Sequence, residues 1–292
     1  GEAYGNLDAV RGVGVFKSSD HGATWTLLSS TSSFRFCTRI LCDNVGNVYL
    51  ATIGNGLQRS TNGGTSWANI TPPVMSNFIY DLEISSTSTT GRLHVTGAVT
   101  TTSQSPHCFT DIPSTVTTSS GWMVPLAPFP SFNNRTEIAC RGNILYAAPA
   151  DNNSAIPQMY KSTNGGANWV ATTGMPFEGI TSGQGWYAIA LGINPANTNQ
   201  CIVGSLDNWK TTDGGNTWSK VSIWVGSSGQ YVHADAHTIS WFDGGNKLIF
   251  ATDGGIFFSS NGGTTIRDRN RNLRIKQFYS CAVHPTSTNY FL

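Results

Sequence analysis

A short polar sequence recurs five times along the chain, each time between apolar segments. Its pattern is Ser/Thr, any residue, Asp/Asn, any residue, Gly, any residue, Thr/Asn/Ser and then Trp. The copies occupy residues 18–25, 60–67, 162–169, 211–218 and 259–266, and the last has Ile266 in place of the tryptophan. A repeat of this kind constrains the fold more than any other feature, because every copy must belong to an equivalent structural unit.

The spacing of the copies predicts the size of that unit. Measured at the Asp/Asn position, the intervals are 42, 102, 49 and 48 residues, so the long interval predicts a degenerate copy near 105–122. Short strand-like segments such as 36–41 and 48–52 recur between the copies. Four short strands in about 48 residues are typical of a propeller blade, which predicts an all-β protein, a β-propeller of four-stranded blades with about six visible, alone or within a larger propeller.

The residue types of the motif indicate a tight turn rather than a reactive site. An Asp or Asn side chain accepts hydrogen bonds from backbone a few residues downstream, and glycine adopts positive φ without steric strain. The Trp can then pack beneath the turn. We therefore expect a structural role for Asp20, Trp25, Asn62, Trp67, Asn164, Trp169, Asp213, Trp218 and Asn261.

The five copies resemble the Asp-box, or bacterial neuraminidase repeat. That repeat occurs in sialidases, xyloglucan-hydrolysing propellers, sortilin-type receptors and many large secreted proteins of the Bacteroidetes. The resemblance covers nearly the whole chain and implies a blade corner in each copy. Proteins that share the repeat have unrelated activities, so it implies a fold and leaves the function open.

The sequence predicts one domain over residues 1–292. We expect blade units at roughly 13–30, 34–72, 78–128, 135–175, 186–224 and 233–270, with a partial blade at 278–292. The first and last units are complementary halves. Either they pair to close a six-bladed ring, or the chain is part of a longer protein with more blades, which the ending inside an apparent strand favours.

Composition excludes several classes of partner. Only 11% of the residues are charged, 17 basic against 16 acidic, where soluble domains usually carry about a quarter. A net charge of +1 gives no general attraction to nucleic acid or anionic membrane, and no apolar run approaches a membrane span of about 20 residues. We therefore expect a glycan or protein partner or self-association, with no nucleic acid, no membrane insertion and no cofactor.

The low charge and the abundance of Asn, Ser and Thr favour a secreted or cell-surface protein. Three glycosylation triplets, at Asn69, Asn134 and Asn152, are compatible with secretion. The six cysteines show no metal-ligand spacing, and their pairing cannot be deduced from sequence. An extracellular location tips the expectation slightly from buried thiols toward one or two disulfides.

Candidate binding residues lie where the innermost strand of each unit begins and where the second strand ends, since these positions border the central channel. The first set includes Arg39, Asp81 and Arg135. Acid and aromatic groups gather on units four to six, which predicts a site there. Its candidate ligand-binding residues are Glu137, Asp151, Trp186, Tyr187, His233 and His237.

Residues His233, Asp235 and His237 alternate in sequence and would project from one face of an extended strand. Two imidazoles and a carboxylate suit a divalent metal, but a flat strand spaces them about 6–7 Å apart, which is wide for one ion. A polar core or a polar ligand site is therefore preferred to a metal site.

The leading interpretation is a binding or structural propeller for a glycan or protein. The alternative is a glycoside hydrolase acting on a neutral polysaccharide, with its paired carboxylates among Asp207, Asp235 and Asp253. A second alternative is a sortilin-like propeller that binds peptides. The basic run 267–276 is interpreted as a solvated loop, or else as a patch for an anionic polysaccharide or a partner protein.

Overall fold

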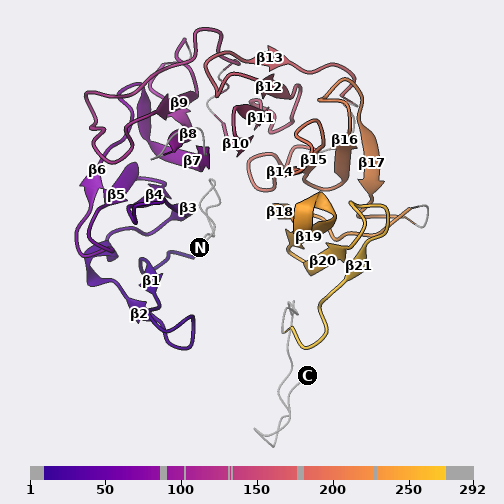
Figure 1. The fold of residues 1–292 in the computed structure, drawn as a ribbon, viewed down its shortest axis with the longest axis horizontal. Coiled ribbons are helices and arrows are strands. Elements are labelled where there is room, and N and C mark those ends of the chain that lie inside the picture. The colour runs from indigo at the N-terminus through magenta and orange to yellow at the C-terminus, as the bar shows by residue number, and fades with distance from the viewer. Residues whose placement is uncertain are drawn as a thin grey trace, which may run out of the picture.

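The structure, a computed structural model, describes residues 10–85, 91–101, 103–130, 132, 134–175, 181–226 and 229–273. It consists of short antiparallel strands with two three-residue 3₁₀ turns, η1 (Ser29–Thr31) and η2 (Asp243–Gly245). The sheets follow one another around a common centre, with β3, β7, β10, β14 and β18 innermost (Figure 1). This arrangement confirms the predicted all-β propeller. The partial blade predicted at 278–292 lies outside the described residues.

Four of the described sheets have four strands in chain order, one has three and one has two. The two-stranded sheet is β1 (Phe16–Lys17) and β2 (Thr26–Leu27). The next two sheets are β3 (Cys37–Cys42), β4 (Val48–Thr52), β5 (Leu57–Ser60) and β6 (Ala68–Asn69), then β7 (Met75–Ser85), β8 (Arg92–Val99) and β9 (His107–Thr110). The last three are β10 (Thr136–Arg141), β11 (Ile144–Pro149), β12 (Tyr160–Ser162) and β13 (Val170–Ala171); β14 (Ala190–Ile193), β15 (Cys201–Gly204), β16 (Asn208–Thr211) and β17 (Ser219–Ser222); and β18 (Ala236–Phe242), β19 (Lys247–Thr252), β20 (Gly255–Ser259) and β21 (Arg267–Asp268).

The hydrophobic core is divided among the interfaces between neighbouring sheets. One cluster joins Tyr49 and Leu57 of the β3–β6 sheet to Leu82 and Leu93 of the next. Another joins β10 and β11 to β14 and β15, and a third joins the last two sheets through residues such as Phe250. A sheet that lies between two neighbouring sheets is covered on both faces. Its strands are therefore apolar along their length, as β15 is.

Each copy of the turn motif makes the same hydrogen bonds. In the second copy the Ser60 hydroxyl accepts from the Gly64 N–H at 2.8 Å, and Asn62 Oδ1 accepts from the Ser66 N–H at 3.0 Å. Gly63 and Gly64 both have positive φ, 67° and 90°, which explains the paired glycines. The equivalent bonds in the other copies lie between 2.7 and 2.9 Å.

The tryptophan of the motif packs toward the preceding sheet. Trp169 meets His107 and Phe129 edge-on, and Trp218 belongs to the core cluster shared with β10 and β11. Trp25 is 62% exposed because no earlier sheet among the described residues covers it. Its indole N–H still donates to the Gly22 carbonyl of its own turn at 3.1 Å, so contact with the turn is local and only burial depends on a neighbouring sheet.

The predicted degenerate copy lies in the loop after β9. The Thr110 hydroxyl accepts from the Ile112 N–H at 3.2 Å, as a motif serine does from the residue two positions on. Ile112 has no side-chain acceptor, so the loop is open and longer. Trp122 still packs on the preceding sheet, where its indole N–H donates to the Ile70 carbonyl at 3.0 Å.

A basic residue directly before the motif's Ser or Thr reaches forward to the next sheet. Lys17 donates to the Gly63 carbonyl at 3.1 Å, and Lys210 donates to the Gly262 carbonyl at 2.9 Å. In both cases the acceptor is the residue after the Asp/Asn of the next motif. We call this contact the inter-sheet latch.

Two junctions make variants of the latch. Arg59 donates to the carbonyls of Pro113 and Val116 in the degenerate loop, both at 2.9 Å. In the β7–β9 sheet the latch position is Phe109, and Arg92, 4.6 Å above its ring, donates instead to the Gly165 carbonyl at 2.8 Å. The last described sheet repeats that pairing, with Arg269 lying 5.3 Å from the Phe258 ring centroid.

The expected disulfides are not found among the five cysteines that the structure describes. Cys37, Cys42, Cys108, Cys140 and Cys201 are free thiols, and Cys281 lies outside the described residues. Cys108 and Cys201 are buried in the core clusters. Their packing as small apolar side chains, rather than any cross-link, accounts for their positions.

We expect Ser162→Ala to lower the free energy of unfolding by about 1–2 kcal/mol, because it leaves the buried Gly166 N–H without its acceptor. Urea denaturation followed by tryptophan fluorescence measures the change. The neighbouring, exposed Thr163→Ala is the control and should leave stability unchanged. Equal effects of the two substitutions would contradict a structural role for the motif hydroxyl.

Loss of a latch should also destabilise the protein. We expect Lys210→Met to lower the free energy of unfolding by about 1 kcal/mol, since it removes the hydrogen bond to the Gly262 carbonyl. Lys161→Met is the matched control, because Lys161 occupies the same position but donates to the Asn199 side chain rather than to a glycine carbonyl. Thermal unfolding should show a smaller loss for Lys161→Met.

Candidate functional site

Charged side chains meet where the inner strands converge. Arg39 comes from β3, Asp81 and Glu83 from β7, Glu137 from β10, and Arg135 from the residue before β10. Asp81 and Glu83 share one face because side chains two residues apart in a strand point the same way. We call these five residues the channel cluster.

Arg39 is the centre of the channel cluster. Its Nε lies 2.6 Å from Asp81 Oδ1, and its Nη2 lies 3.1 Å from Glu137 Oε1 and 3.8 Å from Glu83 Oε1. The side chains of Asp81 and Glu137 are only 1% and 5% exposed. A single guanidinium thus ties three inner strands together, which is an arrangement suited to its fixed fork of donors.

Three carboxylates face two guanidiniums in this cluster. Burial raises the pKa of Asp81, and the neighbouring Glu137 carboxylate raises it further against the effect of Arg39. Burial also raises the pKa of Glu83, and the adjacent Asp81 carboxylate adds to the shift. The excess negative charge is therefore relieved by proton uptake at a higher pH than for exposed carboxyls.

Arg135 joins the channel cluster to the next sheet. Its Nη2 donates to Glu137 Oε2 at 3.0 Å and to the Ile189 carbonyl at 2.9 Å, and its Nη1 donates to the Tyr187 carbonyl. The segment that leads into β14 is thereby fixed against β10. Its aromatic residues consequently have a defined place beside the channel.

A cavity of about 210 Å³ lies beside the channel cluster. Most of its lining comes from β3, β7 and the start of β10, and the far wall comes from β18. The lining residues are Thr38, Arg39, Tyr80, Asp81, Arg135, Glu137, His237 and Thr238. The cavity is thus bordered by charged and hydroxyl groups from sheets on both sides of the common centre.

Three side chains from different segments meet at the β18 side of this cavity. The Tyr187 hydroxyl donates to Asp253 Oδ2 at 2.8 Å, and His237 Nε2 lies 2.8 Å from Asp253 Oδ1. The rings of Tyr187 and His237 are perpendicular at 5.0 Å, and Trp186 packs 5.3 Å from Tyr187. The Asp253 side chain remains 40% exposed. We call Tyr187, His237 and Asp253 the rim triad.

The structure corrects the flat strand expected at 233–237. β18 begins only at Ala236, Asp235 has a φ of +64°, and a bulge interrupts the ladder between Ala236 and Thr238. His233 packs its ring on Gly254, where an added Cβ would lie 2.2 Å from the ring. His233 and His237 therefore have different environments. Within the described residues, no three His, Cys, Asp or Glu side chains are grouped so that they could bind a metal.

Asp235 lies beside the rim triad. Burial raises its pKa, the Asp253 carboxylate raises it further, and His237 and His233 oppose the shift. Its Oδ1 is buried and has no hydrogen-bond partner among the residues that the structure describes. A buried acceptor in this state marks a position that needs either a proton or a ligand.

Two other predicted site residues are used by the fold. Asp207 accepts from Lys220 Nζ at 2.6 Å and from the Trp224 N–H at 3.1 Å. Asp151 Oδ1 accepts from the backbone of Asn153 and Ala155, both at 2.9 Å, and so shapes its own turn. Of the candidate carboxylates, Asp253 is near enough to Asp235 to raise its pKa, whereas Asp207 is paired with Lys220.

Sequence reasoning missed part of the centre. Asp81 was expected beside the channel, but the third acid of the channel cluster, Glu83 of the same strand β7, was not. Glu83 is two residues beyond Asp81 in the same strand, so strand alternation was the signal that could have found it. In the basic run, Arg267 and Asp268 form the exposed strand β21, and residues from 274 on lie outside the described part.

The charge excess predicts a pH-dependent stability. A raised carboxyl pKa means that the folded state binds the proton more tightly, so the free energy of unfolding should fall as pH rises above about 4, the unfolded value, and level off above the folded value. Glu83→Gln should remove the contribution of Glu83 to this fall in the free energy of unfolding. Urea titrations at several pH values measure the difference, with the exposed Asp268→Asn as control. A constant offset at all pH values would contradict the prediction.

No model of a known protein family and no curated protein sequence matches the chain. Its fold is similar to the GH74 xyloglucanase from Xanthomonas campestris, with a TM-score of 0.63 and 18% identity over 86% of this chain and 41% of that one. An ancestral GH74 enzyme gives 0.60 and 18%, over 87% and 33%. PorZ, a surface component of the type-IX secretion system of Porphyromonas gingivalis, gives 0.57 and 13%, over 89% and 38%. The chain spans less than half of each of these proteins, and the likeness is one of β-propeller fold.

Proposed function

We propose that this chain is a binding module of the Asp-box propeller type that takes a glycan at the centre of its ring. The observation that carries the proposal is the rim triad beside the cavity of about 210 Å³. A partly exposed carboxylate, oriented by a tyrosine and a histidine from other segments, is a fixed acceptor for hydroxyl groups. Sites of this kind combine a few oriented polar groups with an apolar surface.

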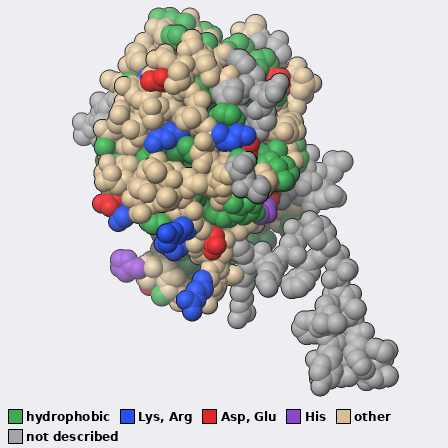
Figure 2. Space-filling view, turned by 90° about the vertical axis from the view of Figure 1, so that its right-hand side faces the viewer, with side chains coloured by type: hydrophobic (Ala, Val, Ile, Leu, Met, Phe, Trp, Pro, Cys, Tyr) green, Lys and Arg blue, Asp and Glu red, His purple; other side chains and the backbone are tan. Residues whose placement is uncertain are grey.

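The chemistry of the rim favours a neutral sugar. Trp186 and Tyr187 supply half-buried aromatic faces against which the apolar face of a pyranose can pack. The guanidinium of Arg39 is already paired with carboxylates, so a ligand anion would have to compete with them. On the side of the molecule shown in Figure 2, charged side chains are few and scattered among uncharged ones. This surface fits a secreted or cell-surface location and gives no general attraction to nucleic acid. None of the helical turns that the structure describes is long and apolar enough to cross a membrane.

A second candidate function, glycoside hydrolysis, rests on Asp235. A carboxyl with a raised pKa beside a second carboxylate is the arrangement of a general acid and its partner. In this case Asp235 would protonate the leaving oxygen as the glycosidic bond breaks. Asp253 would activate the water that attacks the anomeric carbon, or would attack that carbon itself before water releases the sugar. The unpartnered Asp235 Oδ1 favours this candidate over one that uses Asp207.

The binding proposal is tested by calorimetry with a panel of neutral oligosaccharides derived from cellulose, xyloglucan, mannan and starch. At least one should bind, and Asp253→Asn should weaken it about tenfold, the size of one hydrogen bond to a charged group. Asp268→Asn, an exposed acid on β21, should bind as the wild type does. Absence of binding across the panel, or equal binding by both variants, would overturn the proposal.

The hydrolase candidate is separated from binding by its product. Incubation with the corresponding polysaccharides should release reducing ends, and Asp235→Asn should abolish the release while leaving oligosaccharide affinity within a few-fold of the wild type. If the wild-type protein binds the oligosaccharides but releases no reducing ends, the hydrolase candidate is wrong and the binding function remains.

A further inference from the structure

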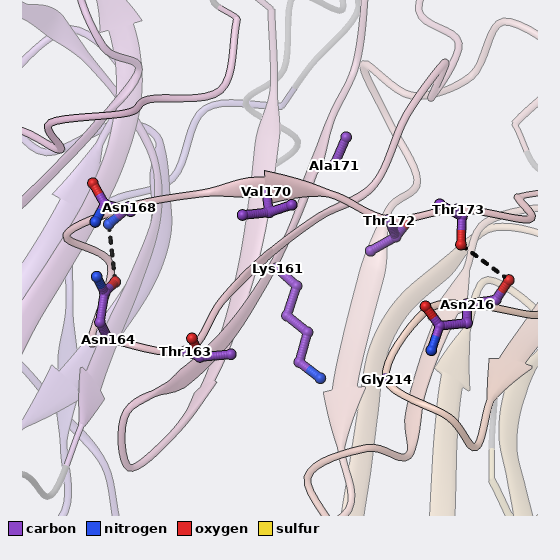
Figure 3. Close-up of a pocket in the computed structure, with 10 residues that line it drawn as sticks. All are labelled: Lys161, Thr163, Asn164, Asn168, Val170, Ala171, Thr172, Thr173, Gly214 and Asn216. Carbon is purple, nitrogen blue, oxygen red and sulfur yellow. Dashed lines mark hydrogen bonds between the residues drawn. The ribbon is translucent and has the colours of Figure 1, made fainter.

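A second cavity, of about 430 Å³, lies at the outer rim between the β10–β13 and β14–β17 sheets. Figure 3 shows Lys161 extending from β12 toward Gly214, with the Asn164–Asn168 turn on one side and Thr173 and Asn216 on the other. Among the described residues that line it, Lys161 is the one charged group and none is acidic. The volume is within the range of small-ligand sites, roughly 300–1,000 Å³.

Lys161 is at the latch position but does not close a latch. Its Nζ donates to Asn199 Oδ1 at 3.1 Å, whereas Lys17 and Lys210 donate to glycine carbonyls of the next motif. Its other N–H groups have no hydrogen-bond acceptor among the described residues. Burial lowers its pKa, against the effect of Asp213, whose carboxylate is engaged by the hydroxyls of its own turn. The Lys161 ammonium at this junction therefore has N–H donors available for a ligand.

Asn168 is a second exception in the same cavity. In the other four copies this motif position holds a hydroxyl that is hydrogen-bonded to the side chain of the motif's Asp or Asn. Asn168 donates its backbone N–H to Asn164 Oδ1 at 2.9 Å. The side-chain NH₂ groups of Asn164 and Asn168 have no hydrogen-bond partner among the described residues. Two carboxamide donors are consequently available beside Lys161.

We propose that this outer-rim cavity binds an acidic sugar, with the carboxylate of a uronic acid unit on Lys161 and its hydroxyls on Asn164 and Asn168. Lys161 makes no latch, so its ammonium can donate to a ligand carboxylate. Such charge-assisted hydrogen bonds are stronger than those between neutral groups. Amide groups donate to and accept from sugar hydroxyls. The cavity differs from the channel site in location and charge, so the inference does not rest on the proposed function.

The sugar is favoured over an acidic peptide by the shape of the lining. The edge strand β13 supplies only Val170 and Ala171, too short a stretch to add a peptide strand by backbone pairing. The other walls are turns that carry amides and hydroxyls, including Thr172 and Thr173. Several short polar groups around one cation match one or two sugar rings rather than an extended chain.

Calorimetry with trigalacturonate is the test, using maltotriose as the neutral trisaccharide and triglutamate as the acidic peptide. Trigalacturonate should bind, and its affinity should fall with added salt as expected for a charge pair. Maltotriose and triglutamate should bind at least tenfold more weakly. Equal binding of maltotriose would overturn the role of the carboxylate, and equal binding of triglutamate would overturn the assignment to a sugar.

Substitutions locate the site. Lys161→Met should weaken trigalacturonate binding at least tenfold, and Lys210→Met, at the equivalent but latched position, should leave it unchanged. Asn168→Thr restores the hydroxyl found in other copies and should keep the fold while lowering affinity several-fold. Asp253→Asn should have no effect, which separates this site from the channel. Wild-type affinity in both Lys161→Met and Asn168→Thr would overturn the proposal.

Discussion

The hydrogen bond from the turn backbone to the motif's Ser or Thr hydroxyl is the interaction on which this architecture depends. It lies at the point where the third strand of a sheet turns into the fourth, and the hydroxyl is buried in the second copy and those that follow, as Ser60, Ser162, Thr211 and Ser259 are. Because that turn is fixed, the following tryptophan points toward the preceding sheet and the basic residue before the turn points toward the next. Packing on one side and the latch on the other both follow from one local geometry.

The central charges are a consequence of the same arrangement. Inner strands from successive sheets converge, so their polar side chains meet at short distances whether or not a ligand is present. Arg39 and Arg135 neutralise most of the acids there, and each also ties two or more strands together. The rim triad differs because Asp253 is partly exposed and is oriented only by neutral or titratable groups. The centre therefore combines a structural charge cluster with a smaller, accessible acceptor.

Features with a local cause were predictable from the sequence. The motif turns, the degenerate copy near Thr110 and the approach of Glu137 and Tyr187 to the channel follow from spacing and strand order. Features that depend on pairing across strands were not. The positive φ of Asp235 and the bulge that follows it broke the expected alternation of His233, Asp235 and His237, and no sequence signal marks either. Likewise, we expected disulfides because of the inferred extracellular location, and no sequence feature indicated which cysteines would lie close together.

Each latch runs from one sheet to the next along the chain, and this fixed direction affects how the number of repeats can change during evolution. Every sheet described here from β1–β2 to β14–β17 carries a cation at its forward side, and the sheets that follow present acceptors at their rear. Since donor and acceptor belong to one repeat of the sequence, duplication or loss of a whole repeat leaves each remaining cation facing an acceptor. Recombination between repeats can thus alter the number of sheets without any compensating substitution. At the junction that follows β10–β13 the cation is present, but Lys161 donates to the Asn199 side chain in place of a turn carbonyl.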